Sequence, residues 1–229
     1  MAIPYSAIWL VLFLPLAGSL FQAIFGGAIV RSFGATGRKV CGIVAVAPIA
    51  LAFLLAAGVT AGLAQAKGEA QILTLFEWIR IYSLNVPFEV RIDALSMTMV
   101  LIITGIGALI HLYATGYMAD DSDYPRFFTY LNLFISAMLV LVLANNLAVM
   151  FIGWEGVGLC SYLLIGFWHK DIANAKAANK AFIVNRIGDW GLTLGIFTIV
   201  AVLAGNADRL IQGGADGRWL SYDVILPNA

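Results

Sequence analysis

Long apolar segments constrain this chain more than any other feature of its sequence. Several of them exceed the roughly 18 predominantly apolar residues that mark a membrane-spanning helix. In all, 62% of the 229 residues are hydrophobic and only 11% are charged, whereas soluble domains carry about 25% charged residues. The sequence therefore predicts an all-α polytopic membrane protein, expected as a multi-pass protein of a bacterial inner membrane.

The apolar pattern predicts about six transmembrane helices, separated by short polar connections. The predicted spans are residues 6–30, 40–63, 94–117, 127–145, 147–168 and 180–204. This pattern divides the chain into an N-terminal helix pair at 1–63, a loop at 64–93, four further helices at 94–204 and a C-terminal tail at 205–229. The tail is polar and rich in glycine, and we expect it to be an outward loop.

The loop between the second and third spans has a different periodicity. Its residues Val86, Phe88, Val90 and Ile92 alternate with polar side chains and a proline, the pattern of a half-buried strand. Residues 72–81 are the expected partner strand, across a turn at Tyr82-Ser83. We predict a small β-hairpin that caps the outer face.

Lysine and arginine residues in the connections predict the orientation, because they are enriched on the cytoplasmic side. The first connection contains Arg31, Arg38 and Lys39, and the fifth contains lysines at 170, 176 and 180. These two connections lie on the same side if the spans alternate. The N-terminus, the hairpin and the tail then face outward.

Composition excludes several classes of function. With 13 basic and 13 acidic residues the net charge is zero, so no basic field indicates nucleic acid as a partner. Cys41, Cys160, His111 and His169 are too few and too far apart for an iron–sulfur cluster or a structural zinc site. We expect no cofactor and no metal, and a lipid bilayer as the surroundings.

Three ionisable side chains lie inside predicted spans. Glu155 is eight residues into its span, roughly 12 Å deep at 1.5 Å per residue. Arg186 and Asp189 lie roughly 9 and 13 Å from the opposite face by the same rise. A charge at this depth costs about 2.5–3.5 kcal/mol on insertion scales and usually marks an ion path or proton relay. Because Arg186 and Asp189 are spaced i,i+3, a structural ion pair is the alternative reading.

Two further residues are candidates for a proton path. His111 lies in the inner third of the third span; a neutral, hydrogen-bonded histidine is the alternative to a relay. Lys180 begins the last span, where a lysine generally extends its ammonium group to the membrane interface, and a role in feeding protons is the second reading.

The string "RFFTYLNLFISAMLVLVLANNLAVMFIGWEGVGLCSYLLIGFW", followed by "NKAFIVNRIGDWGLTLGIF", resembles the largest antiporter-like subunit of respiratory complex I, the NADH:quinone oxidoreductase. The resemblance extends back through "IHLYATGYM" and "FEVRIDALS" to near the N-terminus. The large subunit of Mrp-type sodium/proton antiporters is a near relative, which shares the WE motif and the LLIGFW ending.

The resemblance implies the N-terminal part of an antiporter-like bundle that translocates protons and binds no NADH, flavin, cluster or metal. It implies that Glu155 is the key carboxylate, paired with a lysine on a seventh helix, and that Arg186 and Asp189 assist it. The sequence given contains neither that helix nor the second half-channel. We therefore expect other membrane-arm subunits as partners, including a chain that supplies the missing helices. The alternatives are an Mrp-type antiporter subunit and a non-transporting assembly subunit.

Overall fold

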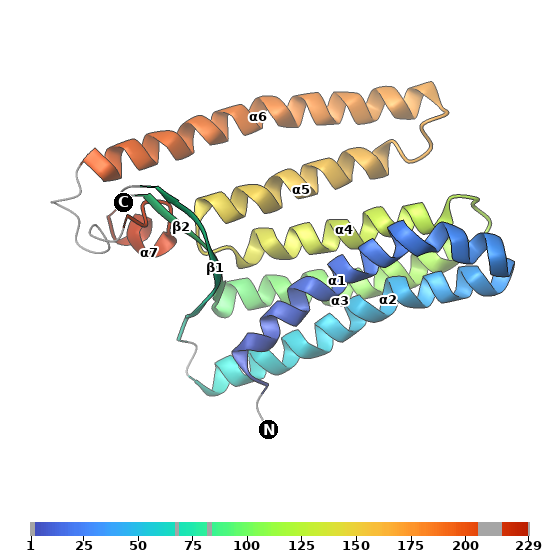
Figure 1. Ribbon diagram of the computed structural model, residues 1–229, viewed down its shortest axis with the longest axis horizontal. Helices are drawn as coiled ribbons and strands as arrows, with labels where there is room; N and C mark the ends of the chain where they lie inside the picture. Colours follow the sequence, from blue (N-terminus) through green and yellow to red (C-terminus); the bar gives the residue numbers. More distant parts are fainter. Residues whose placement is uncertain (1–2, 67–68, 82–83, 206–216, 229) are drawn as a thin grey trace.

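The computed structural model describes residues 3–66, 69–81, 84–205 and 217–228. Long helices lie side by side and span the molecule, and a two-stranded sheet with a short helix covers one end of them (Figure 1). Five of the described helical segments are long and apolar enough to cross a membrane. The chain is a multi-pass membrane protein, as the apolar runs predict.

The first of these five segments, Tyr5–Gln65, folds back on itself. It comprises a 3₁₀ turn, α1 (Ile8–Phe21), a π-helical turn at Gln22–Gly26 and α2 (Gly27–Gln65). The backbone leaves helical geometry at Gly34, where φ is 52°, a value that glycine adopts readily because it has no Cβ. α1 and the later part of α2 then pack against each other (Figure 1), so this segment accounts for the two predicted N-terminal spans.

The remaining long helices are α3 (Ala94–Tyr117), α4 (Tyr124–Leu143), α5 (Leu147–Ile165) and α6 (Ile172–Gly205). α4 lies in the middle and packs on α1, α3 and α5, while α6 packs on α5 at the edge of the molecule (Figure 1). α6 begins eight residues before the predicted span at 180, because its first two turns carry Lys176 and two asparagines, which a hydropathy pattern assigns to a connection.

The predicted β-hairpin is confirmed as an antiparallel pair, β1 (Gln71–Ile81) and β2 (Leu84–Ile92). The register pairs Gln71 with Ile92 at one end and Ile81 with Leu84 at the other. The predicted turn at Tyr82-Ser83 lies outside the described residues. β2 is the more buried strand and packs on α3, α4 and α5, so it closes one end of the helices.

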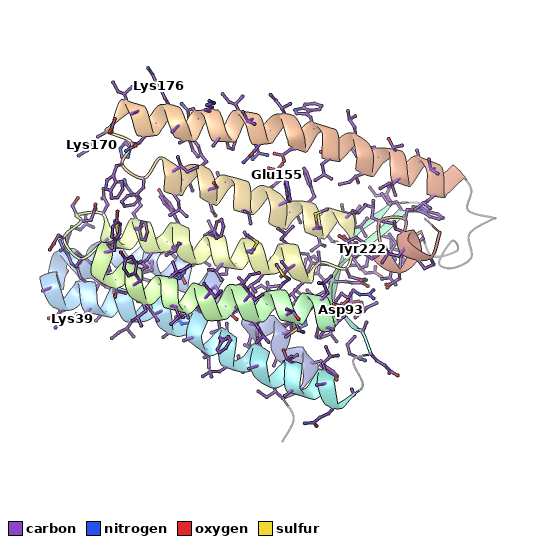
Figure 2. The ribbon with its side chains drawn as sticks, turned by 180° about the vertical axis from the view of Figure 1, so that it is seen from behind. Lys39, Asp93, Glu155, Lys170, Lys176 and Tyr222 are labelled. Carbon is purple, nitrogen blue, oxygen red and sulfur yellow. The ribbon has the colours of Figure 1, made fainter. Side chains whose placement is uncertain are left out.

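Labelled side chains mark the two ends of the bundle. Figure 2 shows Lys39, Lys170 and Lys176 at one end, here called the basic end, and Asp93 and Tyr222 at the other, here called the hairpin end. Asp93 caps α3 by accepting a hydrogen bond from the Ser96 N–H at 2.9 Å.

The tail is more ordered than the sequence indicates. Residues 206–216 lie outside the described ranges; from Gly217 the chain lies at the hairpin end and forms α7 (Tyr222–Ile225). Residues 222–228 thus form short helical turns rather than a plain loop, and the outward position of the tail stays a prediction. Arg218 pairs with Glu89 of β2, and Asp223 pairs with Arg91 at 2.9 Å.

The turn between α4 and α5 joins the same polar network. The buried Asn145 side chain donates to Glu89 Oε2 at 3.0 Å and to Asp223 Oδ2 at 3.1 Å. Asn146 donates to the Pro87 carbonyl at 2.8 Å and caps α5. The two asparagines thus tie this turn to the sheet and the tail.

Candidate functional site

Glycine residues bring α5 close to α4 and so fix the direction of the opposite face of α5. A Cβ added at Gly153 would lie 2.4 Å from the Leu141 backbone nitrogen, and one at Gly156 would lie 2.9 Å from Ala137 Cβ. Glu155 lies two residues after Gly153, about 200° further round the helix at 3.6 residues per turn. It therefore points away from α4, and Figure 2 shows it between α5 and α6.

α6 presents one narrow buried face. Its buried residues Ala178, Asp189, Ile196 and Leu203 are separated by eleven, seven and seven positions, a spacing that keeps them on one side of a helix. Three of them are apolar. Asp189 is therefore a carboxylate placed in the seam where α6 meets α5, near the middle of the 34-residue helix.

Arg186 connects the two carboxylates. Its Nη1 contacts Glu155 Oε2 across the helix interface, and the same nitrogen lies 3.6 Å from Asp189 Oδ2 on its own helix. The Trp154 indole N–H donates to Asp189 Oδ1 at 2.8 Å, so α5 also supplies a donor to the second carboxylate. Glu155, Arg186 and Asp189, the three ionisable residues that the sequence places inside spans, thus meet in one cluster, here called the charged cluster.

Aromatic side chains surround the charged cluster. The Arg186 guanidinium carbon lies 4.6 Å from the centroid of the Phe182 ring, an arrangement in which the ring face attracts the cation. A cavity of about 180 Å³ adjoins the cluster. It is lined by Phe151, Trp190 and Thr193 together with the three charged residues. A space of this size, with three charged side chains in its wall, can hold several water molecules.

The charge balance decides what the cluster can do. Two ionised carboxylates and one guanidinium sum to one negative charge, placed near the middle of two membrane helices. The side chains of Asp189 and Glu155 are only 11% and 23% exposed. An uncompensated charge in such surroundings is unfavourable, and one bound proton or one further cation makes the cluster neutral.

The other two predicted residues lie apart from the charged cluster. His111 is fully buried on α3, with Nδ1 2.8 Å from its own helix's Gly107 carbonyl. Its Nε2 has no hydrogen-bond partner among the described residues. Lys180 is exposed on α6 near the basic end. The structure joins neither residue to Glu155, and a role for either in a proton path stays a prediction.

Sequence reasoning missed Trp154 and Phe182 as parts of the site. Both look like ordinary apolar membrane residues, because nothing in the sequence shows which side chains meet across two helices. Within the described ranges, no group of three or more histidine, cysteine, aspartate or glutamate residues is arranged to hold a metal ion.

Comparisons with known proteins cover most of the chain. Residues 78–128 match the family described as NADH-ubiquinone oxidoreductase (complex I), chain 5 N-terminus. Residues 144–211 match the family described as NADH:quinone oxidoreductase/Mrp antiporter, TM. The second match contains the whole charged cluster.

Three curated relatives illustrate the similarity. The chain is 47% identical over 191 residues to NADH-quinone oxidoreductase subunit L of Mycobacterium tuberculosis, covering 82% of this chain and 29% of that protein. It is 43% identical over 190 residues to the Escherichia coli subunit L, covering 83% of this chain and 30% of that protein. It is 44% identical over 190 residues to NADH-ubiquinone oxidoreductase chain 5 of Chondrus crispus, covering 83% of this chain and 27% of that protein. The chain therefore spans less than a third of the length of these relatives.

Two solved structures share the fold. The Mrp complex from Dietzia sp. DQ12-45-1b superposes with a TM-score of 0.63 at 25% identity, over 85% of this chain and 20% of that chain. The membrane-bound sulfane sulfur reductase, an archaeal respiratory membrane complex, superposes with a TM-score of 0.63 at 19% identity, over 84% of this chain and 27% of that chain. Identity is much higher to the subunit L proteins than to the Mrp chain. Over the residues matched, the chain belongs to the family of NADH-quinone oxidoreductase subunit L and complex I chain 5.

Proposed function

We propose that this chain is part of a proton-translocating subunit of the membrane arm of an NADH:quinone oxidoreductase. The observation that carries the proposal is the charged cluster, in which one arginine serves two carboxylates on neighbouring helices. The subunit carries no electrons, and the redox chemistry takes place in other subunits. As a multi-pass protein it resides in a bacterial inner membrane with its basic end toward the cytoplasm, in agreement with the lysines at that end (Figure 2).

The cluster can take up and release a proton through a small movement of Arg186. While the guanidinium contacts Glu155, that carboxylate is stabilised in its ionised form. When the guanidinium moves toward Asp189, Glu155 loses its cation and binds a proton that is relayed from one side of the membrane through water in the adjoining cavity. Return of the guanidinium releases that proton. Rotation of one flexible side chain thus converts a movement of charge into a proton transfer, with no cofactor involved.

Helices beyond the described residues complete the proton path. Gly188, Gly191 and Gly195 of α6 have open space where a Cβ would lie, unlike Gly153 and Gly156 of α5. Small residues of this kind let membrane helices approach closely. We infer that further helices of the subunit pack on this face of α6 and supply the second cation, whether they come from this polypeptide or from another chain of the complex.

The test is Glu155→Gln in the assembled complex, with proton pumping measured during NADH oxidation in sealed vesicles. We expect pumping to fall at least severalfold while the abundance of the complex stays unchanged. Glu77→Gln is the matched control, because Glu77 is exposed on β1 and pairs there with Arg80. Undiminished pumping in the Glu155 variant, with normal assembly, would instead favour a non-transporting assembly subunit.

An Mrp-type sodium/proton antiporter subunit is the second candidate, favoured by the structural similarity to the Mrp complex. The two candidates differ in the energy source that drives proton movement. Pumping by an NADH:quinone oxidoreductase requires NADH and a quinone, whereas antiport requires an imposed sodium gradient and no electron donor. Proton movement driven by sodium alone, and abolished by Glu155→Gln, would identify the antiporter.

A further inference from the structure

Residues of α2 and α3 line a groove along the seam between these helices. The seam lies on the side of the bundle opposite α6 (Figure 1). The first part of the groove, of about 760 Å³, lies at the basic end, and its second part, of about 640 Å³, lies deeper. The first part ends at Ala47 and Leu112, and the second begins at Ala50 and Leu109. These positions are one helical turn apart on each helix, so the two parts form one continuous groove.

Small residues make the groove, and its deep part is almost wholly apolar. Gly42, Ala47 and Ala50 line it on α2, and Gly105 and Ala108 line it on α3. From Ile43 to Phe53 the lining extends over ten residues, roughly 15 Å at 1.5 Å per residue. Half of a bilayer's hydrocarbon core is also about 15 Å thick. The groove therefore has the length of one phospholipid acyl chain.

The mouth of the groove carries cationic and hydroxyl groups. Arg38 and Lys39 line it, and Arg38 is held in place by donating to the Ala119 carbonyl. Lys39 is exposed and has neither an ion pair nor a hydrogen bond within the described ranges. The Tyr124 hydroxyl also reaches the groove, close enough that a Cβ on Gly42 would lie 2.8 Å from it.

The acidic residues near the mouth leave it cationic. Asp120 lines the groove and offsets one of the two positive charges there. Asp121 accepts a hydrogen bond from the Trp168 indole at 2.9 Å, and Asp123 pairs with Arg126 at 2.9 Å. These last two carboxylates are therefore engaged away from the groove, and the lining as a whole carries a net charge of +1.

We propose that this groove binds one anionic phospholipid, with its phosphodiester at Lys39 and Tyr124 and an acyl chain along the α2–α3 seam. Basic pockets between transmembrane helices commonly bind anionic headgroups, and here the charge lies at the end of an apolar slot of acyl-chain length. The site is separate from the charged cluster. Helices added at α6 would leave it open, because α2 and α3 lie on the other side of the bundle (Figure 1).

The test uses the protein purified from its own membranes, with its associated subunits, in nanodiscs of phosphatidylcholine or of phosphatidylcholine mixed with phosphatidylglycerol. Native mass spectrometry then measures how strongly the chain retains phosphatidylglycerol relative to phosphatidylcholine. Lys39→Gln should weaken that preference about fivefold, the effect of one lysine near an anionic lipid. Lys176→Gln is the matched control, because Lys176 is exposed at the same end but outside the groove, and it should leave the preference unchanged.

A second pair of variants tests the apolar slot. Ala47→Phe fills the groove and should abolish retention of the lipid, whereas Ala177→Phe enlarges an exposed alanine of α6 and should have no effect. Equal retention of the two lipids, or equal effects of the two lysine variants, would overturn the proposal. A photocrosslinking residue at Leu112 provides an independent readout: capture of phosphatidylglycerol supports the site, and capture of a polypeptide shows that a protein helix occupies the groove instead.

Discussion

The close approach of α5 to α4 predicts that alanine substitutions at three glycines of α5 destabilise the protein to different degrees. An alanine at Gly153 would place its Cβ 2.4 Å from the Leu141 nitrogen, about 1 Å inside ordinary contact, which begins near 3.4 Å. The obstacle is backbone, so α5 itself must move. An alanine at Gly156 would meet a side-chain methyl group at 2.9 Å, and one at Gly158 would meet nothing within 4 Å.

Overpacking of this kind generally costs about 1–3 kcal/mol. The intrinsic preference of a helix for alanine over glycine, about 1 kcal/mol in water, acts at all three positions. The difference between Gly153→Ala and Gly158→Ala therefore isolates the contact with α4. We expect that difference to be about 2 kcal/mol, with Gly156→Ala between the two.

The assay is the midpoint of thermal unfolding of the purified protein in detergent. For a chain of this size, about 1 kcal/mol shifts the midpoint by about 2–4 °C, so Gly153→Ala should melt about 4–8 °C below Gly158→Ala. Gly153→Ala should also lower proton pumping, because displacing α5 from α4 changes the position of Glu155 relative to Arg186. Equal midpoints for the Gly153 and Gly158 variants would refute the packing geometry on which the position of Glu155 depends.

Three further predictions concern other parts of the structure. Burial raises the pKa of the Asp93 carboxyl, but hydrogen bonds from the first turn of α3 and from Arg91 outweigh burial and hold the pKa below its ordinary 3.8. The stability that Asp93 contributes is thus complete above pH 3.8 and lost as the pH falls below it, and Asp93→Asn should remove this part of the acid dependence of unfolding. Asn145→Leu should release the tail, measured as faster proteolysis at the hairpin end, since it removes the donor shared by β2 and α7. Trp154→Phe removes the indole donor to Asp189 and should lower pumping severalfold without changing the abundance of the subunit.

Apolar periodicity predicted the helices well where a helix and its hydrophobic stretch coincide. The predicted span at 94–117 matches α3 residue for residue, since Asp93 caps its first turn and Asp120 and Asp121 lie just beyond its last. The hairpin was also predictable, because β2 alternates apolar and polar residues. The start of α6 was not, since a helix that extends beyond the hydrocarbon core carries lysines in its first turns, and hydropathy alone cannot separate such an extension from a connection.

Contacts between distant segments account for what the sequence could not predict. Spacing on one helix indicates the Arg186–Asp189 pair, but the contact of Arg186 with Glu155 depends on how α5 and α6 are rotated against each other. The anchoring of the tail depends in the same way on Glu89 and Asn145, which are far from it in sequence. Glycine contacts also depend on the tertiary arrangement: Gly153 and Gly156 of α5 pack on α4, while Gly188, Gly191 and Gly195 of α6 meet open space.

The proposed proton transfer requires Glu155 to bind a proton when the Arg186 guanidinium moves away from it. Infrared difference spectroscopy of the assembled protein tests this claim most directly, because a protonated carboxyl group has a C=O stretching band that an ionised one lacks and that shifts in heavy water. The account predicts a heavy-water-sensitive carboxyl band that changes during turnover and disappears in Glu155→Gln. If the band is absent from the wild-type protein, or persists unchanged in that variant, the cluster does not carry the proton.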